Sequence, residues 1–358
     1  MPLAALAVSL ALSAPPATLD PATLDPTTLD PARFNHVLVI SVDGLRSDCL
    51  EAPSIELLPN FARLLAGPHT LDARTDSQVT VTLPNQVSTI TGRPVFGPYG
   101  HNWTHNSDPP DIQRGGTLHI NKGAYITSMF DVAHDAGVMT TCHVSKTKFW
   151  LLQQSYGWST GAPDTTGEDN GLAKIDAFHY IESNAALGAA VAGHLERSTK
   201  RTLDFVHFAA PDSAGHGYDW IVKPDSKYFA AVKEVDAALG VILKAIEEDA
   251  DLRGRTALVL TADHGGGVPR KTHTDMTCPL NFRIPFLVWL GEGRPATDLL
   301  AINPNRLRPG REDIGARDAT AQPIRNGDAA NVAMSLLGLP AIPGSFYGAN
   351  EPLRLTAP

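Results

Sequence analysis

The sequence predicts an α/β fold, a three-layer sandwich in which helices cover both faces of a mostly parallel central sheet. Two observations predict it. Short apolar runs rich in β-branched residues alternate along the chain with segments of helical periodicity. These runs also lack a regular polar alternation, which is typical of parallel strands buried on both faces. With 43% hydrophobic residues in a chain of 358, the sequence has ample material for such a core.

Five apolar runs are predicted to be strands of this sheet. They are short, β-branched and without clean alternation, so we interpret them as parallel strands that are covered on both sides. They span residues 37–42, 138–144, 203–210, 257–260 and 284–290.

Three helices are predicted between and after these runs. Residues 128–136 form the first, which ends before Gly137, a residue suited to a helix C-cap. Residues 225–248 form the longest, because apolar side chains recur along one stripe of it. Residues 331–337 form the third, and a Gly-Leu-Pro stop signal follows them. A segment rich in Gly, Pro, His and Asn, at 94–121, is predicted to be a long loop beside a site.

The first 35 residues differ in composition from the rest. An apolar run at 3–12 ends in small residues, is too short to span a bilayer as a helix and resembles a secretory signal. No Lys or Arg precedes it, so a disordered tail is the alternative. Thr-Leu-Asp-Pro then occurs three times, and the repeated prolines favour an extended linker. We predict a secreted or extracytoplasmic protein without a stable membrane anchor, with a signal peptide at 1–14, a Pro-rich linker at 15–35 and a single domain at 36–350.

The formal net charge is −9, so the chain lacks the excess of basic residues that is typical of proteins that bind long nucleic acids. A small anionic ligand stays compatible with it, because bound metal ions would reverse the local sign of charge. The three cysteines, Cys49, Cys142 and Cys278, show no zinc-finger spacing. One disulfide with a free thiol and three buried thiols are both open alternatives.

Three of the predicted strands lead to an acidic residue. Asp43 follows the first, Asp212 follows the third, and Asp263 follows the fourth. Ligands of open parallel sheets bind outside the carboxyl ends of the strands, so we expect these three carboxylates to converge. Such a cluster needs cations to be tolerated.

Histidines accompany these acids. His216 follows Asp212 by four positions in a Pro- and Gly-rich segment, which we interpret as a turn that bends both side chains onto one ion. His264 adjoins the third acid, and His273 lies nine positions further on. Imidazole and carboxylate ligands without thiolate suit Zn²⁺, with Mn²⁺ also feasible. Each residue alone has a turn or capping role as its alternative, but the joint pattern favours a metal site.

A candidate nucleophile lies in the segment 80–92, which is predicted to be a loop that enters a short helix. Pro84 suits the first helical turn, and Gly92 suits the stop. Thr82 then lies at the helix N-terminus, where backbone N–H groups and the helix dipole favour an anion. A hydroxyl there can be ionised by a metal ion and attack a phosphoryl group. A plain N-cap threonine is the alternative.

These motifs together resemble the alkaline phosphatase superfamily and, within it, the type I phosphodiesterase/nucleotide pyrophosphatase family. The resemblance spans residues 36 to about 344. It is carried by four segments, Val42-Asp43-Gly44, Thr82-Leu83-Pro84-Asn85-Gln86, Pro211-Asp212-Ser213-Ala214-Gly215-His216 and Asp263-His264-Gly265. The family has Phe and His where this chain has Leu83 and Gln86, which implies a reshaped leaving-group pocket. The sulfatase branch is set aside because its Cys/Ser-x-Pro-x-Arg nucleophile segment is absent.

The resemblance implies an alkaline phosphatase-like fold and a metal-dependent phosphoester hydrolase with two divalent metal ions, Zn²⁺ first and Mn²⁺ as the alternative. It implies a phospho-threonine intermediate and a small phosphoester or nucleotide as substrate. Asn106 would bind the phosphate, although an Asn stands at the motif position where the family has Gly. One ion would be held by Asp43, Thr82, Asp263 and His264, and the other by Asp212, His216 and His273.

The substrate class is suggested by the resemblance alone. A phosphodiester or a nucleotide pyrophosphate is the first expectation. A nucleotide base could stack on an aromatic ring, and the candidates are Trp103, Trp150 and Tyr156. Packing in the core or at its rim is the commoner role of such rings and is the alternative.

Other functions stay open at this point. A phosphomonoesterase would need an extra cation at the site, for which Lys146, Lys148 and Arg46 are candidates that the sequence does not place. A catalytically inactive phosphate-binding relative is less favoured, because all seven proposed metal ligands are present. A phosphomutase would need a second domain that this chain does not show. The oligomeric state is not predicted.

Overall fold

A computed structural model describes residues 34–111, 114, 116–163, 172–293, 295–315 and 321–356. The predicted signal peptide and nearly all of the predicted linker lie outside the described residues. Within the described ranges, none of the helices combines the length and apolar character needed to cross a bilayer.

An eight-stranded sheet forms the centre of the described part of the chain, with the strand order β4-β3-β5-β1-β6-β7-β2-β8. β1 lies between β5 and β6 and is parallel to both, and every residue of β1 is buried. β7 is antiparallel to β6 and to β2. The strands are β1 (His36–Val42), β2 (Pro68–Arg74), β3 (Met139–Val144), β4 (Ala177–Tyr180), β5 (Thr202–Phe208), β6 (Thr256–Thr261), β7 (Arg283–Trp289) and β8 (Thr297–Asp298).

All five predicted strands are present, but the interpretation of the last one as parallel was wrong. Because β7 is antiparallel to β6, no helix crosses the sheet between them, and residues 262–282 stay at the carboxyl end of β6. β2, β4 and β8 were not predicted. They lie at or next to the two edges of the sheet, where strands are shorter or carry polar residues such as Asp72 and Arg74.

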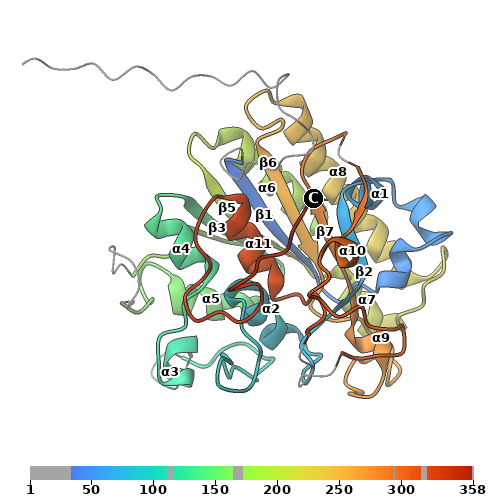
Figure 1. Ribbon diagram of the computed structural model, residues 1–358, viewed down its shortest axis with the longest axis horizontal. Coiled ribbons are helices and arrows are strands. Elements are labelled where there is room, and N and C mark those ends of the chain that lie inside the picture. The colour runs from blue at the N-terminus through green and yellow to red at the C-terminus, as the bar shows by residue number, and fades with distance from the viewer. Residues whose placement is uncertain are drawn as a thin grey trace, which may run out of the picture.

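Helices cover both faces of this sheet (Figure 1). They are α1 (Pro59–Leu65), α2 (Thr82–Thr91), α3 (Leu118–Lys122), α4 (Met129–Asp135), α5 (Trp150–Tyr156), α6 (Asn184–Arg197), α7 (Ala210–Tyr218), α8 (Lys227–Glu248), α9 (Pro279–Phe282), α10 (Leu299–Ile302) and α11 (Asp328–Leu336). Three short 3₁₀ helices are η3 (Ser47–Leu50), η4 (Ser54–Leu57) and η6 (Thr147–Phe149).

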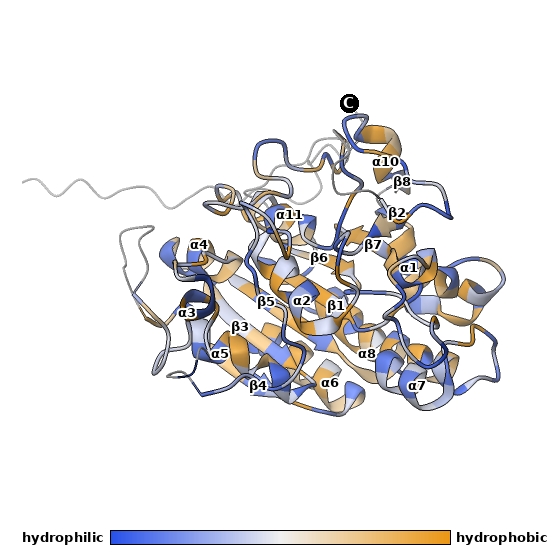
Figure 2. Cartoon of the chain, turned by 90° about the horizontal axis from the view of Figure 1, so that it is seen from below, coloured by the Kyte–Doolittle hydropathy of each residue, from blue (hydrophilic) through white to orange (hydrophobic). Residues whose placement is uncertain are grey.

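The layers follow from which helices pack together. α2, α4 and α11 lie on one face, with α11 against β1 and β6, and α1, α6 and α8 lie on the other. Figure 2 shows the hydrophobic strands between these two layers. The sheet is therefore buried on both faces, as its apolar strands predict, and the three-layer α/β sandwich is confirmed.

The predicted helices are found with small shifts at their ends. Ser128 is the N-cap of α4 and forms a capping box with Asp131, and Ser226 caps α8. α11 begins at Asp328, three residues before the predicted start. The predicted loop at 94–121 is irregular for most of its length and ends in α3.

The structure shows whether the three cysteines form a disulfide. Cys49 and Cys142 are buried and Cys278 is half-buried, and all three are free thiols. The predicted alternative of one disulfide is therefore wrong. Burial raises the pKa of Cys142 and of Cys49, so both thiols are protonated at neutral pH.

Candidate metal centre

The three acidic residues converge at one edge of the sheet, as predicted. β1, β5 and β6 are parallel neighbours, so their carboxyl ends lie side by side. Asp43 directly follows β1, Asp263 follows β6 by two residues, and Asp212 lies in the first turn of α7, just after β5. The structure divides them between two groups that could each hold a metal ion: Asp43, Asp263 and His264, called here the first group, and Asp212, His216 and His273, called the second group.

The segment that carries Asp212 and His216 is a helix, so its prediction as a turn was wrong. Pro211 lies at the start of α7, where a missing N–H costs nothing and the fixed φ suits a helix. Gly215 is required by packing, because a Cβ there would lie 2.3 Å from the Trp220 ring. Four positions along a helix bring two side chains to the same face, so the spacing still joins Asp212 to His216.

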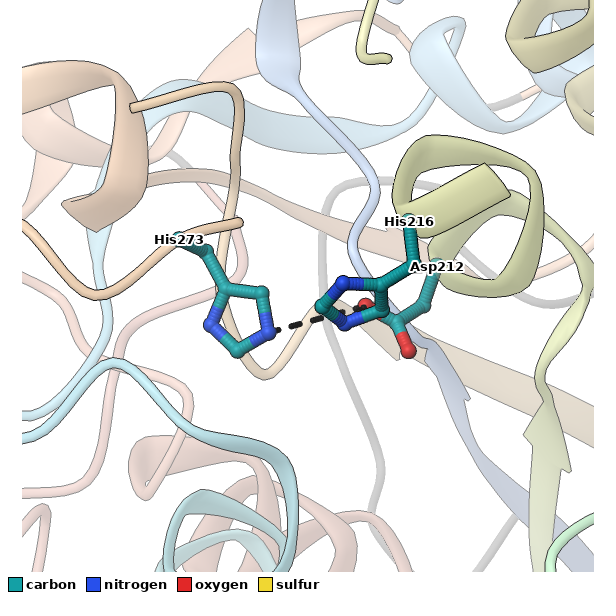
Figure 3. Close-up of side chains that lie close together, drawn as sticks. All are labelled: Asp212, His216 and His273. Carbon is teal, nitrogen blue, oxygen red and sulfur yellow. Dashed lines mark ion pairs between the residues drawn. The ribbon is translucent and has the colours of Figure 1, made fainter. Parts of the chain in front are cut away.

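The second group is open to solvent on one side. Oδ1 of Asp212 lies 3.3 Å from Nε2 of His216 and 3.8 Å from Nε2 of His273. Figure 3 shows the two histidines approaching this carboxylate from different elements, one from α7 and one from the loop that follows β6. The side chain of His216 is 46% exposed, whereas those of Asp212 and His273 are both 4% exposed.

The first group is closed to solvent. Nε2 of His264 lies 3.4 Å from Oδ1 of Asp43 and 3.4 Å from Oδ2 of Asp263, and all three side chains are fully buried. The same nitrogen is 3.9 Å from Oδ1 of Asp212, and the rings of His264 and His273 stack with centroids 3.7 Å apart. The two groups are therefore direct neighbours.

The hydrogen bonds of the three histidines fit a metal site. In each of them Nδ1 faces a backbone carbonyl oxygen. The distance is 2.8 Å from His264 to Gly265, 2.9 Å from His216 to Lys271 and 2.5 Å from His273 to Thr80. A carbonyl oxygen only accepts, so each Nδ1 carries a proton, and Nε2 is the nitrogen that can offer a lone pair to an ion. This outer contact is the one that fixes the tautomer of metal-binding histidines.

The carboxylates fit a metal site at the level of single atoms. Oδ1 of Asp43, Oδ1 of Asp212 and Oδ2 of Asp263 are buried without a hydrogen-bond partner. Buried polar atoms in native proteins are almost always satisfied, and an ion is one of the standard explanations for an exception. These are the oxygens that face Nε2 of the histidines. The residues present therefore fit two divalent cations.

The other oxygens of these carboxylates are held by the protein. Lys146 Nζ donates to Oδ2 of Asp43 and to Oδ2 of Asp212, both at 2.6 Å. Oδ1 of Asp263 accepts from the backbone N–H groups of Gly44 and His264, each at 3.0 Å. Each carboxylate thus has one oxygen fixed by protein donors and one oxygen left for a cation.

The protein's own charges at this site are unevenly balanced. Burial would raise the pKa of Asp43, but the Lys146 ammonium holds it well below its usual range. Burial and the neighbouring Asp43 carboxylate raise the pKa of Asp263 to about 7. Burial would lower the pKa of Lys146, but the two carboxylates raise it, so the ammonium stays charged. The Lys146 ammonium therefore stabilises two of the three acids, whereas Asp263 has backbone donors but no ion pair with a described lysine.

Thr82 lies beside the first group. It is the first residue of α2, with Val81 as the N-cap, so the plain capping alternative does not hold. Its Oγ1 is 3.4 Å from Nε2 of His264, and the residue is 1% exposed. Pro84 in the first turn and Gly92 in the left-handed conformation after the last turn bound α2 as the sequence predicts. The predicted nucleophile and the first group are thus brought together.

Asn106 is held next to the start of α2. Its Oδ1 accepts from the backbone N–H of Leu83 at 2.8 Å and from Lys148 Nζ at 3.1 Å. Leu83 and Gln86, which depart from the family pattern, are fully buried, and Gln86 donates to Ser41 Oγ at 2.8 Å. Both side chains are thus enclosed by the protein, and the expectation that they reshape the leaving-group pocket stays a prediction.

Two of the three candidate cations of the phosphomonoesterase alternative lie at the site. The Lys146 ammonium bridges the carboxylates of Asp43 and Asp212, so two acids already neutralise it. Lys148, two residues further on in η6, contacts the side-chain oxygen of Asn106 instead of a carboxylate. Of these two cations, Lys148 is therefore the one whose charge stays available to a substrate.

Arg46, the third candidate cation, is not available to a substrate. Its guanidinium forms an ion pair with Asp48 and donates to the backbone carbonyls of Trp220 and Gly266. These contacts join the loop after β1 to the segments that carry the second group. Arg46 therefore has a structural role behind the site.

Sequence reasoning missed one residue of the site, His207. Its Nε2 lies 3.1 Å from Oδ2 of Asp43, and its side chain is fully buried. Burial lowers the pKa of His207, so the ring is neutral at neutral pH. A histidine inside the otherwise apolar strand β5 was the available signal, but only the pairing of β5 with β1 places it beside Asp43.

The aromatic residues predicted as candidates for stacking on a base are mostly in the core. Trp103 and Tyr156 are fully buried, as the packing alternative predicts. Trp150 is 46% exposed and stacks on Phe178, with ring centroids 5.0 Å apart, at the edge strand β4. In the described part of the chain, none of the three contacts the first or the second group.

Comparisons with known proteins agree with the fold and the motifs. Ectonucleotide pyrophosphatase/phosphodiesterase family member 5 of Homo sapiens is 27% identical over 239 residues, which are 64% of this chain and 44% of that protein. GPI ethanolamine phosphate transferase 1 of Gibberella zeae is 29% identical over 208 residues, which are 50% of this chain and 20% of that protein. The chain thus matches less than half of the length of either curated relative.

Solved structures share the fold at low sequence identity. The lipoteichoic acid synthase LtaP from Listeria monocytogenes has a TM-score of 0.55 at 13% identity, covering 86% of this chain and 73% of that one. The C-terminal periplasmic domain of EcEptC from Escherichia coli, in complex with Zn, has a TM-score of 0.53 at 13% identity, covering 90% and 86%. A protein in the alkaline phosphatase superfamily from Vibrio parahaemolyticus has a TM-score of 0.50 at 15% identity, covering 89% and 71%.

The fold is therefore that of the alkaline phosphatase superfamily. A sequence model of one family, described as type I phosphodiesterase/nucleotide pyrophosphatase, matches residues 37–327, which is most of the chain. This match includes the first group, the second group, Thr82 and Asn106. The chain belongs to the type I phosphodiesterase/nucleotide pyrophosphatase family.

Proposed function

We propose that this protein hydrolyses a phosphodiester or a nucleotide pyrophosphate, with Thr82 as the nucleophile and two divalent metal ions in the site. One observation carries the proposal. Three buried carboxylate oxygens have no hydrogen-bond partner, and they face histidine nitrogens whose tautomer is fixed for metal binding. The Thr82 hydroxyl lies 3.4 Å from one of these nitrogens.

The donor sets indicate which ions suit the site. The first ion would be held by Asp43, Asp263, His264 and Thr82, and the second by Asp212, His216 and His273. Imidazole and carboxylate ligands favour Zn²⁺, with Mn²⁺ as the alternative. When bound, such ions would lower the pKa of a coordinated hydroxyl and stabilise negative charge on phosphoryl oxygens.

Thr82 supplies the nucleophilic oxygen. Its hydroxyl gives its proton to water, the bond from Oγ1 to phosphorus forms, and the bond from phosphorus to the leaving oxygen breaks, after which the leaving oxygen takes up a proton from water. In the second step the oxygen of a water molecule forms a bond to phosphorus, the bond from phosphorus to Oγ1 breaks, and a proton of that water returns to Thr82. The position of Thr82 at the start of α2 favours these reaction steps, because the positive end of a ten-residue helix faces the developing negative charge.

Asn106 is oriented to bind a phosphoryl oxygen. Its Oδ1 is taken by the Leu83 N–H and by Lys148, so its amide nitrogen is the end that points elsewhere. Among the described residues none accepts a hydrogen bond from that nitrogen. A donor that is held in place without an acceptor suits stabilisation of transition-state charge.

A phosphomonoesterase is the second candidate, and Lys148 favours it. Its ammonium contacts the neutral Asn106 amide and forms no ion pair with a described carboxylate. Burial, and then the charge of Lys146, lowers the pKa of Lys148. A partly buried cation without a counter-charge suits the additional negative charge that a monoester carries and a diester lacks.

Parallel assays separate these candidates. The zinc-loaded protein should hydrolyse bis-p-nitrophenyl phosphate faster than p-nitrophenyl phosphate, and both activities should disappear with a chelator and in Thr82→Ala. Faster hydrolysis of the monoester would assign the protein as a phosphomonoesterase. A Thr82→Ala variant that folds, binds metal and retains full activity would rule out the proposed nucleophile. A wild-type protein that binds two ions but hydrolyses neither compound would support a binding protein.

We also propose an extracytoplasmic location. The apolar run at residues 3–12 supports it, as does the fold shared with a periplasmic domain. Expression of the full chain in a bacterial host with separation of periplasm and cytoplasm tests it. Recovery of an unprocessed chain in the cytoplasm alone would contradict the proposal.

A further inference from the structure

The two oxygens of Asp43 have different surroundings. Oδ1 is buried without a hydrogen-bond partner and faces His264 Nε2 at 3.4 Å. Oδ2 accepts a hydrogen bond from Lys146 Nζ at 2.6 Å and lies 3.1 Å from His207 Nε2. The carboxylate is therefore turned so that one chosen oxygen lies in the first group.

The two donors to Oδ2 differ in their other contacts. Lys146 has a long side chain, and its ammonium is shared with Asp212 of the second group. His207 projects from β5, the strand paired with β1, and is fully buried. The Phe149 ring packs on it with centroids 4.3 Å apart, and Ser145 Oγ lies 3.2 Å from its Nδ1. The imidazole is thus enclosed by the protein and directed at Asp43 alone, whereas the ammonium is divided between Asp43 and Asp212.

We propose that His207 is a positioning residue that aims Oδ1 of Asp43 into the first metal-binding group. A carboxylate oxygen only accepts, so Nε2 of His207 carries the proton and donates it to Oδ2. This bond occupies a lone pair of Oδ2 and opposes rotation of the carboxylate. The inference rests on the proposed function only in that it takes the first group to bind a divalent cation.

The consequence is a specific effect on one of two ions. Partners of metal ligands typically change metal affinity roughly 10- to 100-fold when they are removed. His207 contacts Asp43 and none of the ligands of the second group among the described residues. Loss of the His207 side chain should therefore weaken the binding of an ion to the first group and leave binding to the second group largely unaffected.

The chain offers a matched control in His143. It lies on β3, the other neighbour of β5, and it is also a buried histidine inside a strand. Neither of its ring nitrogens has a hydrogen-bond partner, and it contacts Asp204 and other histidines instead of the site. Replacing either histidine by leucine removes a buried imidazole from the same sheet, so a general loss of stability would appear in both variants.

The experiment measures Mn²⁺ binding, by calorimetry and by electron paramagnetic resonance, in a His273→Ala background that disables the second group. We expect His207→Leu to weaken binding to the first group roughly 10- to 100-fold, and His143→Leu to leave it unchanged. His207→Gln, whose amide can still donate to Asp43, should recover most of the affinity. Circular dichroism of each variant verifies folding.

Two results would overturn the inference: wild-type affinity in a folded His207→Leu variant, or an equal loss of affinity in His143→Leu. Binding is measured without turnover, so the outcome is separate from that of the proposed function. A protein that shows the expected affinity loss but hydrolyses no phosphoester keeps His207 as a positioning residue and removes the hydrolase proposal.

Discussion

Metal binding at the first group should release protons, so its affinity should depend on pH. In the metal-free protein, burial and the Asp43 carboxylate raise the pKa of Asp263 to about 7. Burial would lower the pKa of His264, but the three surrounding carboxylates raise it. An ion binds only the deprotonated form of either group, so protons compete with it increasingly as the pH falls.

The magnitude follows from the raised pKa of Asp263. A carboxyl group with a pKa of about 7 is roughly three-quarters protonated at pH 6.5 and roughly one-tenth protonated at pH 8. Affinity for the ion should then fall ~4-fold between pH 8 and pH 6.5 through Asp263 alone, equivalent to about 0.8 kcal/mol. The raised pKa of His264 acts in the same direction. A carboxyl group with the ordinary pKa of 3.8 would add nothing to the pH dependence of affinity in this range.

Calorimetric titration with Mn²⁺ tests this reasoning, again in the His273→Ala background. The titration is made at pH 6.5 and pH 8, each in two buffers with different ionisation enthalpies. We expect weaker binding at the lower pH and an apparent enthalpy that depends on the buffer, which reports the released protons. Equal affinity at both pH values with a buffer-independent enthalpy would refute the assignment of a raised pKa to the first group.

Three further predictions concern other parts of the molecule. Lys148→Met should lower kcat/KM for a phosphomonoester ~10-fold more than for a diester, measured with the two nitrophenyl esters, because only the monoester brings an additional charge. Burial lowers the pKa of His101 to about 3, so below pH 6.5 the unfolded chain binds a proton that the folded chain does not. Stability should therefore decrease as the pH falls, by about 2 kcal/mol from this group at pH 5, and urea unfolding at pH 7 and 5 should show a smaller decrease in His101→Gln. Gly215→Ala should cost about 1–3 kcal/mol and lower the melting temperature, because its Cβ would lie 2.3 Å from the Trp220 ring.

The sequence was sufficient for those features that depend on local order along the chain. The apolar runs identified the central strands, and an acidic residue after three of them identified where carboxylates meet, because parallel neighbours share a carboxyl edge. Thr82 was placed at the start of α2 by Pro84 and Gly92, which act within one helix. These inferences needed no knowledge of which strands pair.

The errors and omissions involve contacts between distant segments. Gly215 suggested a turn, but its absence of a side chain serves the Trp220 ring, and the segment is helical. His207 and Lys146 were not assigned to Asp43, because only the pairing of β5 with β1 and β3 brings them there. The antiparallel direction of β7 likewise depends on the whole sheet, since its apolar run resembles that of a parallel strand.

Charge links the ions to substrate binding in this site. The whole chain carries a formal charge of −9, and an anionic substrate would meet a site with three carboxylates, those of Asp43, Asp212 and Asp263. Lys146, paired with two of these acids, and Lys148, beside Asn106, bring two positive charges, so the protein groups of the site sum to about one negative charge when all three acids are ionised. Two divalent ions would change this to about three positive charges. The proposed ions, which would satisfy the carboxylate oxygens that lack a partner, would therefore also attract a phosphoester, so that substrate binding and the proposed chemistry at Thr82 would share one condition.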